Sequence, residues 1–152
     1  MSEHAEHRDH AIIAGFGVPG RAVAEWMANH NIDFVVIEQN LDIVQRCGGR
    51  ALAIIAGNVL DEEVLKRAGI ERASVIAIAL PNESVVLDAV SLARRLNPTI
   101  KIIARCTFIS GGLEASRRGA DETIVAEETA AREFVRLLDG GHAAIRSSPN
   151  HI

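Results

Sequence analysis

The chain has 152 residues, of which 48% are hydrophobic and 24% are charged, and its formal net charge is −4 at pH 7. This length suits a single domain with a substantial core, and the slight negative charge without a basic cluster argues against a nucleic-acid partner. The sequence contains no run of about 18 apolar residues, so we expect no membrane-spanning helix, and the polar segment 1–10 lacks the apolar core of a secretory signal.

Only 3% of the residues are aromatic, so the core must be built from aliphatic side chains, as in buried parallel sheets. Cys47 and Cys106 are far apart in sequence, and we expect free thiols in a cytosolic protein rather than a disulfide. His4, His7 and His10 recur every three residues, which makes a metal site conceivable. Because no apolar pattern would order that segment, we interpret it as a solvated tail.

Short apolar runs alternate with amphipathic segments along the chain. Strands are expected at residues 10–14, 34–37, 51–55, 74–80, 100–104 and 122–125. Helices are expected at residues 19–30, 40–48, 61–68, 84–97, 113–118 and 128–138. Regular alternation of strands and helices predicts a Rossmann-type, doubly wound α/β fold with a parallel six-stranded sheet in the order 3-2-1-4-5-6.

Three glycine pairs interrupt this alternation of strands and helices. We expect Gly48-Gly49 to end the second helix and Gly111-Gly112 to break the chain before the fifth. Gly140-Gly141 and the polar residues that follow predict a disordered tail. The expected organisation is therefore a polar tail at 1–9, one nucleotide-binding domain at 10–140, and a disordered tail at 141–152.

Two of the predicted helices carry large apolar side chains. Val23, Trp26 and Met27 share one face of the first helix, and we interpret Trp26 as a core residue. In the last helix, one apolar stripe can pack on the sheet of its own subunit, or Phe134 or Leu138 can be left for a partner. The sequence leaves these two arrangements open.

A G-x-G-x-x-G motif spans Gly15 to Gly20, between the first predicted strand and the first predicted helix. In this context the motif indicates dinucleotide binding. Gly15 permits the tight turn, Gly17 lets a pyrophosphate approach the backbone, and Gly20 lets the helix pack close to the strand. The helix then offers free N–H groups to the phosphates, and Pro19 suits its first turn.

An acidic residue completes the motif. Glu38 ends the second predicted strand, 18 residues after Gly20, close to the ~20 expected of the acid that holds a ribose diol. Ligands of such sheets bind at the carboxyl ends of the strands. The candidate binding residues at this edge are Gly15, Phe16, Gly17, Val18, Pro19, Gly20, Glu38, Gln39, Asn58, Val59, Leu80, Pro81, Asn82 and Arg105.

Several segments in this order resemble the potassium-transport nucleotide-binding domain called RCK or Trk-N, and most of all the cytosolic domain of Kef-type cation:proton antiporters. The resemblance rests on segments 14–20, 36–40, 57–58, 65–70, 79–82, 103–105 and 118–121 and covers residues 10–138. It implies that the glycine loop and the acid hold NAD(H), AMP, ADP or ATP. The family often has aspartate where this chain has Asn58, which leaves the preferred adenine nucleotide open. Arg105 matches a family arginine that can reach phosphates or a dimer partner.

Three functions are compatible with this sequence. The first is a regulatory domain that senses an adenine nucleotide and controls a membrane cation transporter or antiporter subunit from the cytoplasmic side. The second is a small NAD-dependent oxidoreductase, which the missing second domain, the absence of Tyr and the lack of a histidine near the site disfavour. The third is a structural interaction module. The resemblance implies a homodimer, with the predicted helices at 84–97, 113–118 and 128–138 as candidate surfaces.

Overall fold

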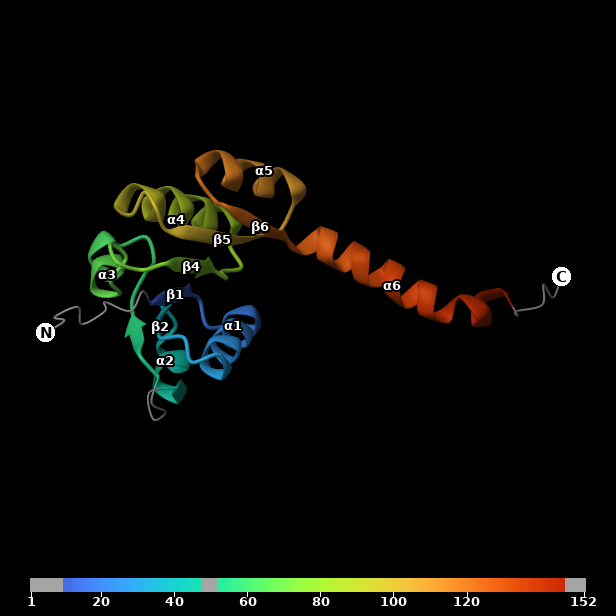
Figure 1. Ribbon diagram of the computed structural model, residues 1–152, viewed down its shortest axis with the longest axis horizontal. Coiled ribbons are helices and arrows are strands. Elements are labelled where there is room, and N and C mark those ends of the chain that lie inside the picture. The colour runs from blue at the N-terminus through green and yellow to red at the C-terminus, as the bar shows by residue number, and fades with distance from the viewer. Residues whose placement is uncertain (1–9, 48–51, 147–152) are drawn as a thin grey trace, which may run out of the picture.

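The computed structural model describes residues 10–47 and 52–146, which form one parallel six-stranded sheet with helices on both faces (Figure 1). The strands are β1 (Ala11–Ala14), β2 (Phe34–Glu38), β3 (Ile54–Ala56), β4 (Val75–Ile78), β5 (Lys101–Cys106) and β6 (Glu122–Val125). The helices are α1 (Val18–Asn29), α2 (Leu41–Cys47), α3 (Glu62–Arg67), α4 (Glu83–Leu96), α5 (Ile109–Arg118) and α6 (Ala126–Arg146). The strand order β3-β2-β1-β4-β5-β6 confirms the predicted Rossmann-type topology.

Some sequence predictions lie outside the described residues. These are the tail 1–9 with His4 and His7, the glycine pair 48–49 at the expected end of the second helix, and residues 147–152 of the expected disordered tail. Within the part that the structure describes, no helix combines the length and the hydrophobicity needed to cross a bilayer.

The fifth helix begins earlier than predicted. Gly111 and Gly112 were expected to break the chain, but both lie inside α5 and are buried. A Cβ on Gly111 would lie 2.2 Å from the carboxyl carbon of Glu83, and one on Gly112 would lie 2.8 Å from Val125 Cγ2. The two glycines therefore let α5 pack closely on α4 and β6, and this packing outweighs their poor helix propensity.

Helix α6 also departs from the prediction. It begins at Ala126, directly after β6, and continues to Arg146 through Gly140 and Gly141, so the expected helix end at Leu138 and the disorder expected from residue 141 are wrong as far as residue 146. Residues 127–140 are all exposed, and Figure 1 shows the helix extending away from the sheet. The arrangement in which its apolar stripe packs on its own sheet is therefore wrong.

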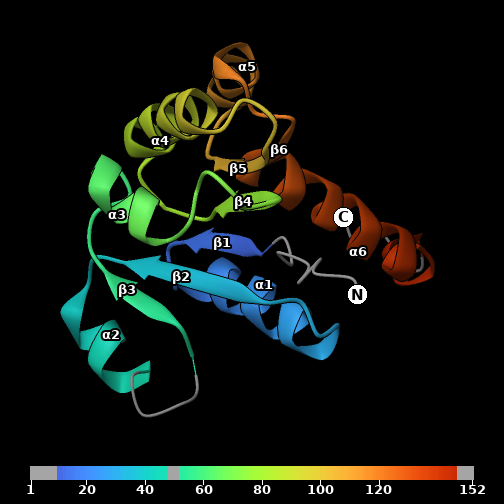
Figure 2. The same ribbon diagram turned by 60° about the vertical axis from the view of Figure 1, so that its left-hand side comes forward.

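The other helices divide between the two faces of the sheet (Figure 2). On one face, α1 packs over β1 and β2, where Ile13, Val36 and Met27 form a small buried cluster. On the opposite face, α3, α4 and α5 cover a larger cluster that includes Leu65 and Val90. The aliphatic core predicted from the composition is thus split into two unequal layers.

The half of the sheet formed by β4, β5 and β6 is fully covered on one face only. Along β5, Ile102, Ala104 and Cys106 are fully buried, whereas Ile103 and Arg105 are half-buried. In a parallel sheet with helices on both faces, successive side chains are all buried. The alternation in β5 therefore marks a face that lacks a covering helix.

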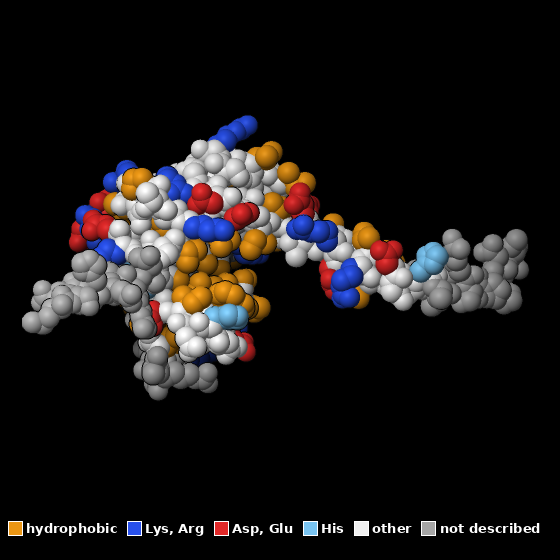
Figure 3. Space-filling view, viewed as in Figure 1, with side chains coloured by type: hydrophobic (Ala, Val, Ile, Leu, Met, Phe, Trp, Pro, Cys, Tyr) orange, Lys and Arg blue, Asp and Glu red, His pale blue; other side chains and the backbone are white. Residues whose placement is uncertain are grey.

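This uncovered face is an apolar groove of about 580 Å³ between α1 and the base of α6. It is lined by Pro19, Ala22, Val23, Trp26, Met27, Val75, Ala77, Ala79, Ile103, Arg105, Ile124, Ala126 and Thr129. Figure 3 shows hydrophobic side chains gathered in this region. Trp26 is 54% exposed here, so its interpretation as a core residue is wrong. The physical reason is that no helix within residues 10–47 and 52–146 packs over it.

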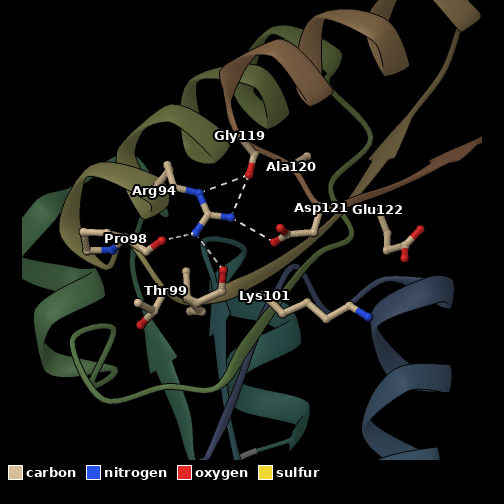
Figure 4. Close-up of a pocket in the computed structure, with 9 residues that line it drawn as sticks. Arg94, Pro98, Thr99, Lys101, Gly119, Ala120, Asp121 and Glu122 are labelled. Atoms are coloured by element: carbon tan, nitrogen blue, oxygen red, sulfur yellow. Dashed lines mark hydrogen bonds and ion pairs between the residues drawn. The ribbon is translucent and has the colours of Figure 1, made fainter.

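At the amino-terminal edge of the strands, the side chain of Arg94 in α4 joins the turn before β5 to the turn before β6 (Figure 4). Its Nη1 donates to the carbonyl oxygens of Pro98 and Ile100, each at 2.8 Å. Its Nε and Nη2 donate to Gly119 O at 3.1 and 2.8 Å, and Nη2 also donates to Asp121 Oδ2 at 2.9 Å. All N–H donors of the guanidinium are used in these hydrogen bonds. The hollow of about 600 Å³ around Arg94 is therefore a structural junction, at which α4 is joined to the two turns.

Asp121 completes this junction. Its Oδ2 also accepts a hydrogen bond from Ile102 N–H at 2.7 Å. This backbone hydrogen bond and the neighbouring Arg94 guanidinium hold the pKa of Asp121 below its usual value. The carboxylate therefore stays charged at neutral pH and joins α4 to the first residues of β5.

We predict that Arg94→Ala lowers the free energy of unfolding by on the order of 3 kcal/mol, because partly buried carbonyl groups lose a charged donor. The matched control is Arg95→Ala, since Arg95 is largely exposed and is paired with the Glu62 side chain. It should change stability little. Urea unfolding followed by circular dichroism measures both variants, and equal losses would contradict the role given to Arg94.

Candidate nucleotide-binding site

The glycine loop makes the tight turn that the sequence predicts. Gly15 has φ +96°, in the left-handed region that favours glycine, and its N–H donates to Ile37 O at 2.9 Å. A Cβ on Gly20 would lie 1.9 Å from Gly15 O. The first turn of α1 can therefore lie this close to the loop only because residue 20 is glycine.

The amino-terminal end of α1 is open. Gly17 is its N-cap, and no side chain caps the helix. Pro19 lies in the first turn, where its missing N–H costs nothing. A Cβ on Gly17 would meet no protein atom within 4 Å. The free N–H groups and the helix dipole make this end suited to bind phosphate groups.

Glu38 connects the loop to the neighbouring strand. It is the last residue of β2, and its side chain is half-buried. Its Oε2 accepts a hydrogen bond from Phe16 N–H at 2.7 Å, and its Oε1 accepts one from Asn40 N–H at 2.8 Å. These two bonds hold the carboxylate beside the glycine loop. Each oxygen retains a further lone pair, so the carboxylate can also accept hydrogen bonds from ribose hydroxyls.

A pocket of about 450 Å³ adjoins Glu38 at the carboxyl edge of the sheet. It is lined by Ile37, Glu38, Gln39, Asn40, Gly57, Asn58, Val59, Leu80, Pro81, Asn82 and Val85. The structure thus brings together candidates that follow three different strands, as expected for the shared edge of parallel strands.

Two amides in this pocket are partly used by the fold. Asn58 Oδ1 accepts from Leu60 N–H at 2.9 Å, and Asn82 Oδ1 caps α4 by accepting from Val85 N–H at 3.1 Å. In each case the Nδ2 group remains the end that can donate to a ligand. The family that the sequence resembles often has a charged aspartate at the position of Asn58. Neither Asn58 nor Asn82 carries such a charge.

Arg105 is not brought into this pocket. Its Nη1 donates to Leu80 O at 3.2 Å, and its side chain lines the apolar groove instead. Leu80 lines the pocket and also contacts the glycine loop, since a Cβ on Gly15 would lie 2.9 Å from Leu80 Cδ2. Arg105 is therefore connected to the candidate site through Leu80, and its contact with phosphate stays a prediction.

Sequence reasoning did not name every residue of the pocket. Asn40 and Gly57 follow the strands β2 and β3, so their position after a strand end was a signal that could have placed them here. Val85 lies on the first turn of α4, and its approach depends on how that helix folds back over the sheet. No local pattern in the sequence predicts that approach.

Comparison with known proteins gives the family. Residues 11–126 match the model of the TrkA-N domain. The chain is 30% identical over 131 residues to the putative cation/proton antiporter YbaL of Escherichia coli, covering 86% of this chain and 24% of YbaL. It is 35% identical over 102 residues to the probable potassium channel protein 2 of Methanocaldococcus jannaschii, covering 64% of this chain and 29% of that protein. The chain thus spans about a quarter of the length of these relatives.

Solved structures share the fold. The TrkA-N domain of the inner membrane protein YbaL from Escherichia coli matches with a TM-score of 0.83 and 30% identity, over 88% of this chain and 99% of that domain. The GsuK channel bound to NAD matches with 0.80 and 24% identity, over 92% and 25% of the two chains. The AMP-bound Kef CTD of Shewanella denitrificans matches with 0.74 and 20% identity, over 93% and 83%. At the two lower identities, the likeness shows the fold alone.

The glycine geometry yields a prediction about folding. Gly20→Ala places a Cβ against Gly15 O and should lower the free energy of unfolding by on the order of 3 kcal/mol or prevent folding. Gly17→Ala meets open space at an ordinary φ of −75°, so its stability should stay close to that of the unmodified chain. Thermal unfolding compares the two, and a well-folded Gly20→Ala variant would contradict the close approach of α1 to β1.

Proposed function

The chain belongs to the TrkA-N domain family, and from this we propose that it is a regulatory domain which binds an adenine nucleotide and controls the transport of potassium or another monovalent cation. The ligand is NAD(H) or one of AMP, ADP and ATP. The solved relatives support this choice, since the GsuK channel is bound to NAD and the Kef CTD to AMP.

The observation that carries the proposal is the hydrogen bond between Glu38 Oε2 and Phe16 N–H, at 2.7 Å. It brings a ribose-binding carboxylate next to a glycine loop that opens onto an uncapped helix. On this basis the phosphates of the nucleotide lie over Gly17, the ribose diol binds Glu38, and the adenine base occupies the pocket that Asn58 lines.

Regulation requires a partner and a second state. YbaL is a putative cation/proton antiporter and the Methanocaldococcus protein is a probable potassium channel, and the matched part covers 24% and 29% of their lengths. The domain therefore acts on a membrane cation transporter or antiporter subunit at the cytoplasmic face of the membrane. Nucleotide changes transport only if it binds one arrangement of the domain better than another.

The site is one of binding rather than catalysis. Among the described residues that line the pocket, Glu38 is the one ionisable side chain, and its two oxygens accept hydrogen bonds from Phe16 N–H and Asn40 N–H. Cys106 is fully buried, and burial together with the Glu83 carboxylate raises the pKa of its thiol, which disfavours a nucleophilic role. An assay for hydride transfer with bound NAD(H) should find no turnover, and measurable turnover would favour the oxidoreductase alternative.

The first prediction concerns binding itself. Gly17→Val places a side chain where we propose that the pyrophosphate approaches, so binding of NAD(H) or AMP in calorimetry should fall below detection. Because a Cβ at this position meets no protein atom within 4 Å, the variant should still fold. The matched control is Gly140→Ala, which also meets open space but lies on α6, far from the loop. Unchanged affinity of the Gly17→Val variant would place the ligand elsewhere.

A second prediction concerns the ribose. Because Glu38 accepts hydrogen bonds from the diol and repels a 2′-phosphate, NAD(H) should bind at least about tenfold more tightly than NADP(H). Glu38→Gln should narrow this preference, since the amide has no charge to repel the phosphate. Equal affinity of the unmodified chain for both dinucleotides would remove Glu38 from this role.

The working unit is a homodimer, because a single rigid domain offers no second arrangement for the nucleotide to favour. Light scattering at micromolar concentration should give twice the chain mass of 16.3 kDa. A monomer at all concentrations, with and without nucleotide, would contradict the dimer while leaving nucleotide binding untouched.

A further inference from the structure

The carboxylate of Glu83 lies at the amino-terminal end of a helix other than its own. Glu83 is the first residue of α4, and its side chain is half-buried. Its Oε2 accepts hydrogen bonds from Thr107 N–H at 2.6 Å and from Phe108 N–H at 3.1 Å. Both N–H groups belong to the turn between β5 and α5, and Figure 2 shows α5 beside α4. One carboxylate oxygen thus joins the start of α4 to the start of α5.

Helix α5 is capped by this carboxylate. Phe108 is the N-cap residue of α5, and its side chain makes no capping hydrogen bond. In a capping box, a glutamate at the third helical position accepts a hydrogen bond from the N–H of the N-cap residue. The third position of α5 is Gly111, and a Cβ added there would overlap the Glu83 carboxyl group. Glu83 therefore takes the place of the capping glutamate, and the glycine leaves room for it.

The residues just before Glu83 form one wall of the candidate nucleotide pocket. Leu80, Pro81 and Asn82 line this pocket and connect β4 to α4. Glu83 fixes one end of the wall through its bonds to the turn. Arg105 fixes the other end, because its Nη1 donates to Leu80 O at 3.2 Å. The position of the wall is therefore set by groups at the carboxyl end of β5.

The end of β5 is a firm anchor for this wall. Cys106, the last residue of β5, is fully buried and is paired with Val125 of β6 in the sheet. Core strands are the most stable parts of a fold, whereas connecting segments on the surface are more mobile. A pocket wall made of a connecting segment gains a fixed geometry when it is bonded to such a strand.

We propose that Glu83 is a positioning residue for the nucleotide, and that its carboxylate holds the wall 80–82 in the arrangement that binds the adenine base. This inference rests on the nucleotide binding proposed above. Glu83 acts through the preceding residue, Asn82, whose Nδ2 group can donate to the ligand.

The charge of Glu83 by itself predicts the opposite effect on binding. A carboxylate near the site repels the phosphate groups of a nucleotide, so its removal should tighten binding if charge were its only contribution. Positioning predicts that the same removal weakens binding. The direction of the change therefore separates the two roles.

Calorimetry with AMP and with NAD(H) on the full-length chain measures this direction. Glu83→Ala should weaken binding at least about tenfold, because a wall without its charged hydrogen bonds no longer keeps its place against the base. Glu83→Gln keeps an acceptor oxygen on a side chain of equal length and should bind more tightly than Glu83→Ala. The matched control is Glu63→Ala in the first turn of α3, where the side chain is 80% exposed, and its affinity should equal that of the unmodified chain. Equal or tighter binding by Glu83→Ala would overturn the proposal.

A second variant separates positioning from helix capping. Adding Phe108→Asp to Glu83→Ala gives α5 a cap of its own, since aspartate is a favoured N-cap residue and residue 108 has the extended backbone of that position. Thermal unfolding should show that this double variant regains the stability lost in Glu83→Ala. Its nucleotide affinity should stay low, because α4 is still not bonded to the turn. Recovery of both properties would make Glu83 a helix cap only.

The contact with Gly111 tests the position of the carboxylate without any ligand. Gly111→Ala in the unmodified chain should lower the midpoint of thermal unfolding, because the added methyl group overlaps the Glu83 carboxyl group. In the Glu83→Ala chain the same substitution should raise the midpoint, since the space is free and alanine favours a helix. A change of the same sign in both chains would contradict this geometry.

Failure of the positioning role and failure of the proposed function give different results. If the unmodified chain binds none of AMP, ADP, ATP and NAD(H), the proposed function fails and the role of Glu83 fails with it. If the unmodified chain binds a nucleotide and Glu83→Ala binds it equally well, the proposed function stands and only the positioning role is wrong.

Discussion

The approach of α1 to β1 is the constraint on which the candidate site depends. An added Cβ at Gly20 would lie 1.9 Å from Gly15 O, so the first turn of α1 can sit directly above the end of β1 only with glycine at that position. This contact places the open end of α1 at the carboxyl edge of the sheet. It also holds Phe16 where its N–H can reach the Glu38 carboxylate. The groups that we propose bind phosphate and ribose are thereby brought together.

The two faces of the sheet are stabilised unequally. Helices α3, α4 and α5 cover one face, and Arg94 ties α4 to the turns before β5 and β6. On the other face, no helix in the described part of the chain covers β5, so an apolar groove remains there. Pro19 of the glycine loop lines this groove, and Arg105 joins it to the pocket through Leu80 O. A molecule bound in the groove and a ligand bound in the pocket would therefore contact residues that also contact each other. If binding at one of these places changes the affinity at the other, the effect must be equal in both directions.

The sequence by itself determined the order of the elements and the core of the candidate site. Apolar runs that alternate with amphipathic segments specify a parallel sheet, because short connections and right-handed crossovers leave few other topologies. The site could be predicted because strand ends in a parallel sheet share one edge. Glu38, Asn58 and Leu80, distant in sequence, line one pocket for that reason. The glycine motif could also be predicted, because the turn and the start of the helix involve residues that are adjacent in sequence.

Only the tertiary structure decided which apolar faces are covered. A sequence pattern marks a side chain as apolar but does not say which element reaches it. Gly111 and Gly112 look like a chain break, yet contacts with α4 and β6 keep them inside a helix. Trp26 looks like a core residue, and the sequence leaves open whether the stripe on α6 packs on its own sheet. Both are exposed, and α6 follows β6 directly without a loop. These differences arise from long-range packing, which no local window of the sequence contains.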